Sequence, residues 1–461
     1  MFDLGSGATG STSATVGGVV ALPSAEEIRA MTVQIATGAA TDDVSDPQRV
    51  DQIRAFEELK CAVGGAQAAL TVRFDASQRR EQAVQGVRGD RQVRGVALQV
   101  GLARRESHHV AKRLVRLADV LHTDLLHTLA AMRAGKLSER RAQLIATELA
   151  CLSPENRQRA DVCLAEDTEW LAAQGDKQLI AEARRLAYRL EPSAYLDRFS
   201  RAESNRRVTT RPAPEGMLYL TALLPLVQGV ACYAALKTHA DSLIAGGDPR
   251  SRDQIIADTL VERVTGQGRA DQVPIEVGIV LSDRTAVGMD DEPATVRTCG
   301  PIPADMARYL VLTANMQGLA TLRRLYAHPS TGQITGRESI ARKFPAGLAD
   351  LIRIRDGDNC RMAYCGAPIR DTDHAKAKLE GGEASYGNGQ GLCEACNIAK
   401  EAMGMQARPR PGPDGQHATS HIVDTTTPTG HVYTSVAPRV RYVHRPRPVV
   451  EIYLAEDYRA S

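Results

Sequence analysis

The 461-residue sequence predicts a mainly α-helical N-terminal region, then a small α+β segment, then a short C-terminal module held together by cysteines. Three observations predict this fold class. Residues 25–205 are rich in Ala, Leu, Arg and Glu, and their apolar residues recur at helical spacing. β-Branched residues become frequent from about residue 270, which favours strands. Four of the nine cysteines lie within residues 360–396.

Changes in composition divide the chain into five expected segments. Gly, Ser, Thr and Ala without any period predict a disordered N-terminus, and Pro, Arg, His and Thr without a helical period predict a tail with only short strands. The segments are a disordered N-terminus (1–24), a helical region (25–268), an α/β connecting region (269–345), the cysteine-rich module (346–405) and a Pro/Arg-rich tail (406–461).

The helical region carries signals for helix starts and stops. Ser24 and Glu27 have the spacing of a capping box, and the helical pattern that resumes at Asp253 stops near Gly266. Within residues 99–131, the apolar residues at helical spacing are Val110, Leu114, Leu117, Leu121 and Leu125.

One uncharged stretch, Met217–Leu236, has about the length of a bilayer span. The Pro-Glu-Gly sequence at 214–216 predicts a turn between strands near 208–210 and 218–224, and Pro225 suits the first turn of a helix. We therefore expect a buried hairpin followed by a core helix, and no association with a membrane.

Short elements are expected around the cysteines. The β-branched run 273–282 predicts a buried strand, residues 326–335 predict a hairpin, and a helix is expected around 345–355. In the tail, short strands are expected near 432–433 and 449–454.

The net charge of only +2 means that a DNA-binding surface must come from local clusters of basic residues. One Trp and five Phe disfavour a platform for stacking single-stranded bases. The basic runs at 104–116 and 201–211 are either solvated faces or phosphate contacts. In the second run, the candidates for nucleic-acid contact are Arg206, Arg207 and Arg211.

The start of the sequence has no basic segment typical of a signal peptide. Outside the C-terminal group, the five remaining cysteines are scattered and odd in number, which fits reduced thiols better than a disulfide framework. We therefore expect a cytoplasmic protein.

The four clustered cysteines form two close pairs, Cys360-x4-Cys365 and Cys393-x2-Cys396. This spacing is typical of a closed tetrahedral zinc site, whereas the alternative is four buried thiols brought together by chance. Bound zinc contributes on the order of 10 kcal/mol to folding, which a module this short and rich in Gly would need. No acidic or thiol-rich cluster converges in sequence on the histidines of the helical region, so we do not expect a second metal site at His108, His109, His122 or His127.

Polar residues with a different chemistry lie between and after the cysteine pairs. Asp373 and His374 are neighbours, Asn388 precedes the second pair, and Asn397 follows it directly. Oxygen ligands suit a hard cation such as Mg²⁺, so this set favours a magnesium-dependent hydrolytic centre. Lys400 lies three residues after Asn397 and is expected on the same helix face.

The order Asp-His, Asn, Cys-x2-Cys-Asn-x2-Lys resembles the HNH endonuclease motif of the ββα-metal fold, with Asn397 in place of the third His. Upstream, RRVTTRPAPEGM (206–217), GDPRSRDQIIADTLVERVTG (247–266) and TPTGHVY (427–433) resemble the helical domain-of-unknown-function 222 family. Its actinobacterial members commonly carry a C-terminal HNH module. The resemblance therefore implies that the cysteine-rich module has the ββα-metal fold, stabilised by zinc.

The resemblance also implies roles for the polar residues. His374 would be the general base, Asp373 and Asn397 would hold one Mg²⁺ or another divalent metal, and Asn388 would brace the loop. Because neighbours on a strand point to opposite faces, Asp373 and His374 can face one phosphate only if the strand ends there. Lys400 and the three arginines of the 206–211 run would contact the nucleic acid, most simply double-stranded DNA.

Alternatives remain open at this point. The site could be inactive in a zinc-folded protein that binds DNA or a partner, although the four polar residues argue against loss of activity. Cleavage of RNA is equally compatible with these residues. The helical region could recognise DNA or a partner, or serve only as a platform for homo-oligomer formation.

Overall fold

The computed structural model describes residues 15–16, 19–38, 43–89, 92–214, 217–269, 279–280, 285, 288, 290–297, 300–316, 344–410 and 421–438. The chain forms two compact units, each built from two stretches of sequence. The first unit contains residues of Met1–Ala76 and Val115–Tyr195, and the second contains residues of Ser77–Leu114 and Leu196–Ser461. Each unit is described by itself.

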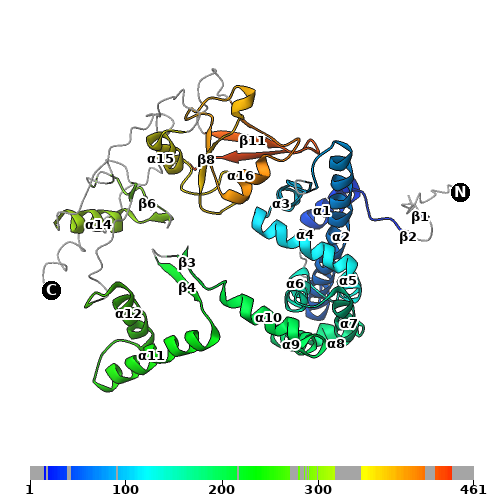
Figure 1. Cartoon of the computed structure of the whole chain (residues 1–461), viewed down its shortest axis with the longest axis horizontal. Helices are drawn as coiled ribbons and strands as arrows, with labels where there is room; N and C mark the ends of the chain where they lie inside the picture. The colour runs from blue at the N-terminus through cyan, green and yellow to red at the C-terminus, as the bar shows by residue number, and fades with distance from the viewer. Residues whose placement is uncertain are drawn as a thin grey trace. The chain divides into compact units, whose positions relative to one another are not determined.

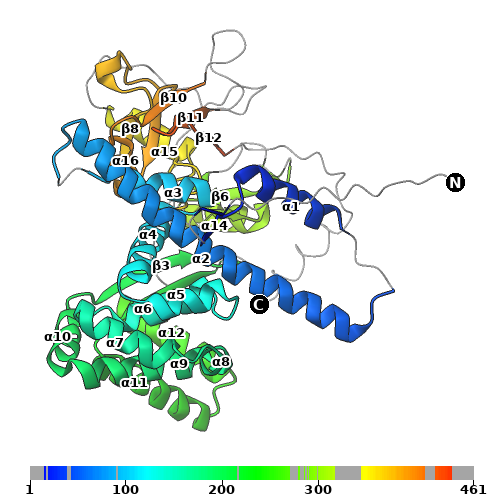
Figure 2. The ribbon, with the colours of Figure 1, turned by 90° about the vertical axis from the view of Figure 1, so that its right-hand side faces the viewer.

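The first unit is helical, as the sequence predicts. The strands β1 (Thr15–Val16) and β2 (Val19–Val20) form a short pair at its N-terminal end. Its helices, some of which extend beyond the unit, are α1 (Ala25–Thr37), α2 (Asp46–Val84), α4 (His108–Thr123), α5 (Leu126–Arg133), α6 (Glu139–Leu149), α7 (Pro154–Ala165), α8 (Thr168–Ala173) and α9 (Asp176–Leu190). Figure 2 shows α2 along its length.

Apolar residues at helical spacing form the core of this unit. Leu117, Leu121 and Leu125 are buried and pack with residues of α5, α6, α7 and α9, which confirms the prediction for three of the five apolar residues named within 99–131. Leu114 is buried outside this core, and Val110 is half-buried. The predicted capping box is also present, because the Ser24 hydroxyl accepts from the Glu27 backbone N–H and the Glu27 carboxylate accepts from Ser24. Local sequence signals thus set both the helix start and the buried face.

In the second unit, α10 (Pro192–Glu203) leads into the antiparallel pair β3 (Arg207–Pro212) and β4 (Leu218–Leu223). The pair is followed by α11 (Leu226–Ala245) and α12 (Arg252–Thr265), which pack on each other. The hairpin and the helix are where the sequence predicts them, but the expected burial is wrong. Every residue of both strands is exposed, and α11 buries only Ala240, because no further described layer covers them. Among the described residues, no helix is long and apolar enough to cross a membrane.

A small sheet follows, with β5 (Ile279–Val280), β6 (Ala294–Val296) and β7 (Gly300–Ile302) in this order, next to α14 (Ala304–Met316). The predicted strand at 273–282 overlaps β5, and the predicted hairpin at 326–335 lies outside the described residues. The Arg297 guanidinium donates to both carboxylate oxygens of Asp358 at 3.0 Å, and thereby links β6 to the C-terminal module.

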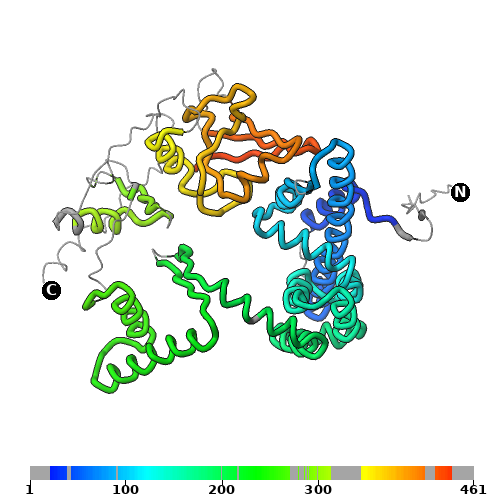
Figure 3. Tube along the Cα trace, in the orientation of Figure 1, coloured from blue at the N-terminus to red at the C-terminus, as the bar shows by residue number. Residues whose placement is uncertain are grey.

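The C-terminal module begins with α15 (Ala346–Arg355), the helix expected around 345–355. Strands β8 (Asp371–His374) and β9 (Gly389–Leu392) pair in antiparallel fashion and lead directly into α16 (Glu394–Lys400), with the 3-10 turn η2 (Lys378–Glu380) in the connecting loop. This β8–β9–α16 order is the ββα arrangement that the resemblance implies, and Figure 3 traces it along the chain.

The tail forms more sheet than the sequence predicts. Strands β10 (Gln406–Pro409), β11 (Ile422–Thr426) and β12 (Val432–Val436) make a three-stranded antiparallel sheet. Only β12 was expected, and the strand predicted at 449–454 lies outside the described residues. Helix α3 (Val96–Arg104), from far upstream in the sequence, belongs to this same unit, and its Leu98 and Leu102 enter the core of the module (Figure 1).

A buried ion cluster fixes β9 in the module. Asp356 is fully buried and accepts from the Arg355 guanidinium at 2.8 and 3.0 Å and from the backbone N–H of Gly391 at 2.9 Å. Arg361 approaches the same carboxylate at 3.3 Å. Arg355 also donates to the carbonyl oxygens of Tyr386 and Gly389, so the cluster ties the end of α15 to the strand that precedes α16.

We predict that Asp356→Asn lowers the stability of the module by about 3–5 kcal/mol, because it leaves two buried guanidinium groups without a compensating charge. Proteolysis of the full-length protein across a urea series measures this loss. Asp350→Asn is the matched control, because Asp350 is half-exposed and its ion pair with Arg297 should contribute less than about 1 kcal/mol. Equal urea sensitivity of the two variants would contradict the role given to Asp356.

Candidate functional site

The ββα arrangement brings the predicted polar residues onto adjoining elements. In the β8–β9 pair, Asp373 lies opposite Gln390 and His374 lies opposite Gly389. Cys393 follows β9 directly and caps the N-terminus of α16. Its sulfur accepts from the backbone N–H of Cys396 at 3.5 Å. Asn397 and Lys400 then follow within α16, which packs against β8.

His374 is the last residue of β8, so the strand ends where the sequence analysis required it to end. Its ring is buried, stacks at a tilt on Phe344 with 4.7 Å between centroids, and has Nδ1 4.0 Å from Asp373 Oδ1. Burial lowers the pKa of His374, and the nearby lysines act in the same direction, whereas the Asp373 charge opposes them. The imidazole is therefore neutral near pH 7, and its buried Nε2 has no hydrogen-bond partner among the described residues.

The Asp373 carboxylate pairs with Lys400. The Lys400 Nζ lies 2.6 Å from Asp373 Oδ2 and 3.1 Å from Glu401 Oε1, and it donates to the His374 carbonyl oxygen at 3.0 Å. Burial of Lys400 favours the neutral amine, but pairing with Asp373 and Glu401 outweighs it and raises the pKa of Lys400. The Lys400 ammonium thus points inward to the Asp373 carboxylate. The contact of Lys400 with nucleic acid, which the sequence predicts, stays a prediction.

Asn388 holds the loop between the two strands. Its Oδ1 accepts from the Lys376 backbone N–H at 2.8 Å, and its Nδ2 donates to the carbonyl oxygens of Lys376 and Glu383 at 3.1 and 2.9 Å. The loop passes so close to Asn388 that a Cβ on Gly382 would lie 1.9 Å from the Lys376 carbonyl oxygen. These contacts set the position of the chain directly after His374.

Asn397 contacts a carboxylate that the sequence analysis did not include in the site. Its Nδ2 lies 3.4 Å from Asp371 Oδ2, a long hydrogen bond. Asp371 and Asp373 are two residues apart on β8, so they share the strand face that meets α16. That alternation was a signal in the sequence that could have identified Asp371 as a site residue.

The four clustered cysteines form a group that could hold a metal ion. Their sulfur atoms all lie within 4.8 Å of one another, and the Cys365 and Cys393 sulfurs are 3.9 Å apart. Tetrahedral zinc with bonds of about 2.3 Å would separate its sulfur ligands by about 3.8 Å, whereas a disulfide needs about 2.05 Å. All four thiols are free, and hydrogen bonding from the neighbouring thiols, chiefly Cys360, lowers the pKa of Cys393. The donor set and its spacing therefore fit a thiolate-bound metal.

The predicted arginines lie apart from the ββα residues, on and before β3. Arg207 and Arg211 share one face of the strand, and the Arg211 guanidinium lies 4.0 Å from the centre of the Tyr219 ring. Arg206 and Arg207 donate only to nearby carbonyl oxygens, those of Glu203 and Asn205. All three residues are exposed, so their guanidinium groups are accessible to a polyanion.

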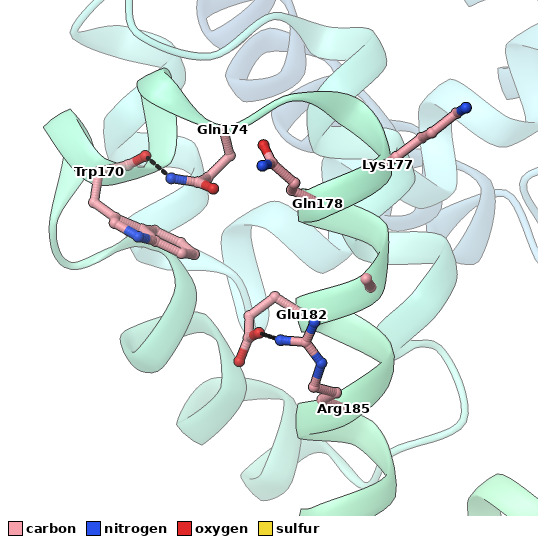
Figure 4. A pocket seen from close by; sticks show the side chains of 7 residues that line it. Trp170, Gln174, Lys177, Gln178, Glu182 and Arg185 are labelled. Atoms are coloured by element: carbon pink, nitrogen blue, oxygen red, sulfur yellow. Dashed lines mark hydrogen bonds and ion pairs between the residues drawn. The ribbon is translucent and has the colours of Figure 1, made fainter.

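The helical unit also has a shallow hollow between α8 and α9, which Figure 4 shows from close by. Gln174 donates to the Trp170 carbonyl oxygen at 3.1 Å at one end, and Arg185 pairs with Glu182 at the other. None of the predicted site residues lines this hollow, and two pairs of its lining residues, Trp170 with Gln174 and Glu182 with Arg185, already bond to each other, so we do not assign it to the site.

Comparison with protein families gave two matches. A family described as domain of unknown function (DUF222) matches residues 50–356, and a family described as HNH endonuclease matches residues 360–402. Comparison with curated proteins and with solved structures gave no match. The second matched segment contains β8, β9, α16 and all four clustered cysteines. Because the first match covers more than half of the sequence, the chain belongs to the DUF222 family and carries an HNH endonuclease domain at residues 360–402.

Proposed function

We propose that the protein is a metal-dependent endonuclease that hydrolyses phosphodiester bonds in double-stranded DNA. The observation that carries the proposal is a neutral, buried His374 beside the Asp373 carboxylate, at the end of β8 in a ββα module, with an Nε2 that has no partner among the residues that the structure describes. A nitrogen that is desolvated, neutral and without a partner is suited to accept a proton from water. The HNH endonuclease match supports nucleic acid as the substrate.

Each site residue has a separate role in the proposed hydrolysis. His374 accepts a proton from the attacking water at Nε2, the water oxygen bonds to phosphorus, and the bond from phosphorus to the 3′ oxygen breaks. The leaving 3′ oxygen takes a proton from a solvent water molecule, and His374 later returns its proton to solvent. The products carry a 5′ phosphate and a 3′ hydroxyl. Asp373, with Asn397, would hold a divalent cation such as Mg²⁺, which supplies charge neutralisation at the phosphate when bound. Asn388 keeps the loop after His374 in place through its three hydrogen bonds.

The cysteine cluster has a structural role in this proposal. Four thiolates leave no open position for water on a tetrahedral zinc ion, so this metal would stabilise the module and take no part in hydrolysis. It would fix Cys393 and Cys396 at the start of α16, and Asn397 follows them directly.

A second candidate function, binding without cleavage, is favoured by one observation. The Lys400 ammonium lies 2.6 Å from Asp373 Oδ2, where it supplies the positive charge that a metal would otherwise provide. If Lys400 stayed there in the presence of divalent metal, the module would bind nucleic acid or a partner without cleaving. The proposed nuclease instead requires Lys400 to move from the carboxylate towards the phosphate.

We predict that His374→Ala slows metal-dependent nicking of supercoiled plasmid at least about 10²-fold, because the general base is lost. The zinc content and the circular dichroism spectrum should stay unchanged. His431→Ala, at an exposed histidine in the β11–β12 turn, is the control and should cut normally. A His374→Ala protein that nicks at the wild-type rate would rule out His374 as the base.

We predict about one zinc ion per chain by elemental analysis of the purified protein. Cys393→Ser should lower this content and expose residues 358–404 to protease, because metal binding and folding of the module are coupled. Cys163→Ser, at an exposed cysteine of the helical unit, is the control and should retain full zinc. Zinc-free wild-type protein that resists protease would contradict the proposed role of the cluster.

We predict that replacing Arg206, Arg207 and Arg211 together by Ala weakens duplex DNA binding. The dependence of log K on log salt should become shallower by about 0.9 for each lost phosphate contact. Arg140→Ala combined with Arg185→Ala removes two charges that are paired with acids and should leave the slope unchanged. Identical salt slopes for the triple variant and the wild type would show that the β3–β4 hairpin does not contact DNA.

A further inference from the structure

A helical elbow from the DUF222 region lies against the HNH domain. We call residues Gly95–Leu114 the α3–α4 elbow. Helix α3 is capped at its C-terminus by Arg105, which has φ 58°. At the start of α4, the Ser107 hydroxyl accepts from the Val110 backbone N–H at 3.3 Å. The two helices approach closely, because a Cβ on Gly101 would lie 2.9 Å from the Ala111 Cβ and 3.0 Å from the Glu106 carbonyl oxygen.

The α3–α4 elbow covers the cysteine cluster with apolar surface. Leu98 and Leu102 are 2% and 1% exposed, and both belong to the buried cluster that contains Cys360 and Cys396. A Cβ on Gly95 would lie 2.7 Å from the Ala402 Cβ, so the backbone before α3 touches the residues that follow α16. The contacts exclude water from one side of the thiol cluster.

Polar contacts fix the position of the elbow. The Thr429 hydroxyl donates to Gln99 Oε1 at 3.2 Å, and Gln99 is buried. This hydrogen bond joins α3 to the turn between β11 and β12, more than 300 residues later in the sequence. The elbow is therefore held from two sides, by the apolar contacts at the cysteines and by the hydrogen bond at the tail sheet.

We propose that the α3–α4 elbow is the cover that retains the metal of the cysteine cluster, with Leu98 and Leu102 as the side chains that shield the sulfurs. The proposal rests on the proposed zinc site and adds a component to it from the DUF222 region. The two leucines pack in the same buried cluster as Cys360 and Cys396, and they keep water and chelators away from these sulfurs. The apolar shell around a metal site controls solvent access, and changes outside the ligands typically alter metal affinity by about 10–100-fold.

The test is the rate at which full-length protein releases zinc to an excess of a coloured chelator, 4-(2-pyridylazo)resorcinol. Leu102→Ala opens the cover and should release zinc about 10-fold faster or more. Leu98→Ala opens the same apolar contact and should also speed release. His109→Ala, at an exposed residue of the elbow, is the control and should match the wild type.

The outcomes separate this proposal from the function of the module. Zinc-loaded wild-type protein together with release at the wild-type rate from both leucine variants would overturn the cover while leaving the zinc site intact. Wild-type protein that contains no zinc would overturn the zinc assignment and the cover together. If Leu102→Ala fails to fold, faster release from Leu98→Ala supports the cover, and release from Leu98→Ala at the wild-type rate overturns it.

Discussion

The convergence of four cysteine sulfurs within 4.8 Å is the constraint on which the module depends. Four thiolates in one place are unfavourable unless a cation binds them, because ionised sulfurs repel one another at this distance. Once they are held, the turn after β9 and the first turn of α16 have fixed positions. Asn397 then has to face β8, where Asp371 and Asp373 lie. The structural site thus determines the geometry of the chemical one.

The other side of the site depends on buried charge rather than on thiols. Asp356 compensates Arg355 and Arg361 and accepts from Gly391 within β9, so the strand opposite Asp373 and His374 is anchored to α15. Around His374, the proposed general base, polar groups are left unsatisfied: among the described residues Nε2 is buried without a hydrogen-bond partner, and the Asp373 carboxylate pairs with Lys400. Rigid support around a reactive, incompletely satisfied centre is what a hydrolytic site requires.

Local patterns in the sequence predicted the helices, the 207–223 hairpin and the close approach of the cysteines, because spacing and turn residues act over a few positions. The ββα order was implied by the resemblance to the HNH motif. Long-range packing was not predictable in the same way. Nothing in the sequence of α3 indicates that Leu98 and Leu102 pack against cysteines some 260 residues later. The exposure of 217–236 was also missed, since an uncharged stretch does not show which surface covers it. Asp371 could have been found from its alternation with Asp373, whereas the inward position of Lys400 depends on a partner that only the fold provides.

The central claim is that this module hydrolyses DNA with the help of a divalent cation. The most direct measurement is incubation of the purified full-length protein with supercoiled plasmid, in Mg²⁺ or in excess EDTA, followed by separation of the plasmid forms. The account predicts nicked or linear plasmid with Mg²⁺ and intact supercoiled plasmid with EDTA. Intact plasmid under both conditions, from protein that carries its zinc and binds DNA, would contradict the account and leave Lys400 as the permanent partner of Asp373.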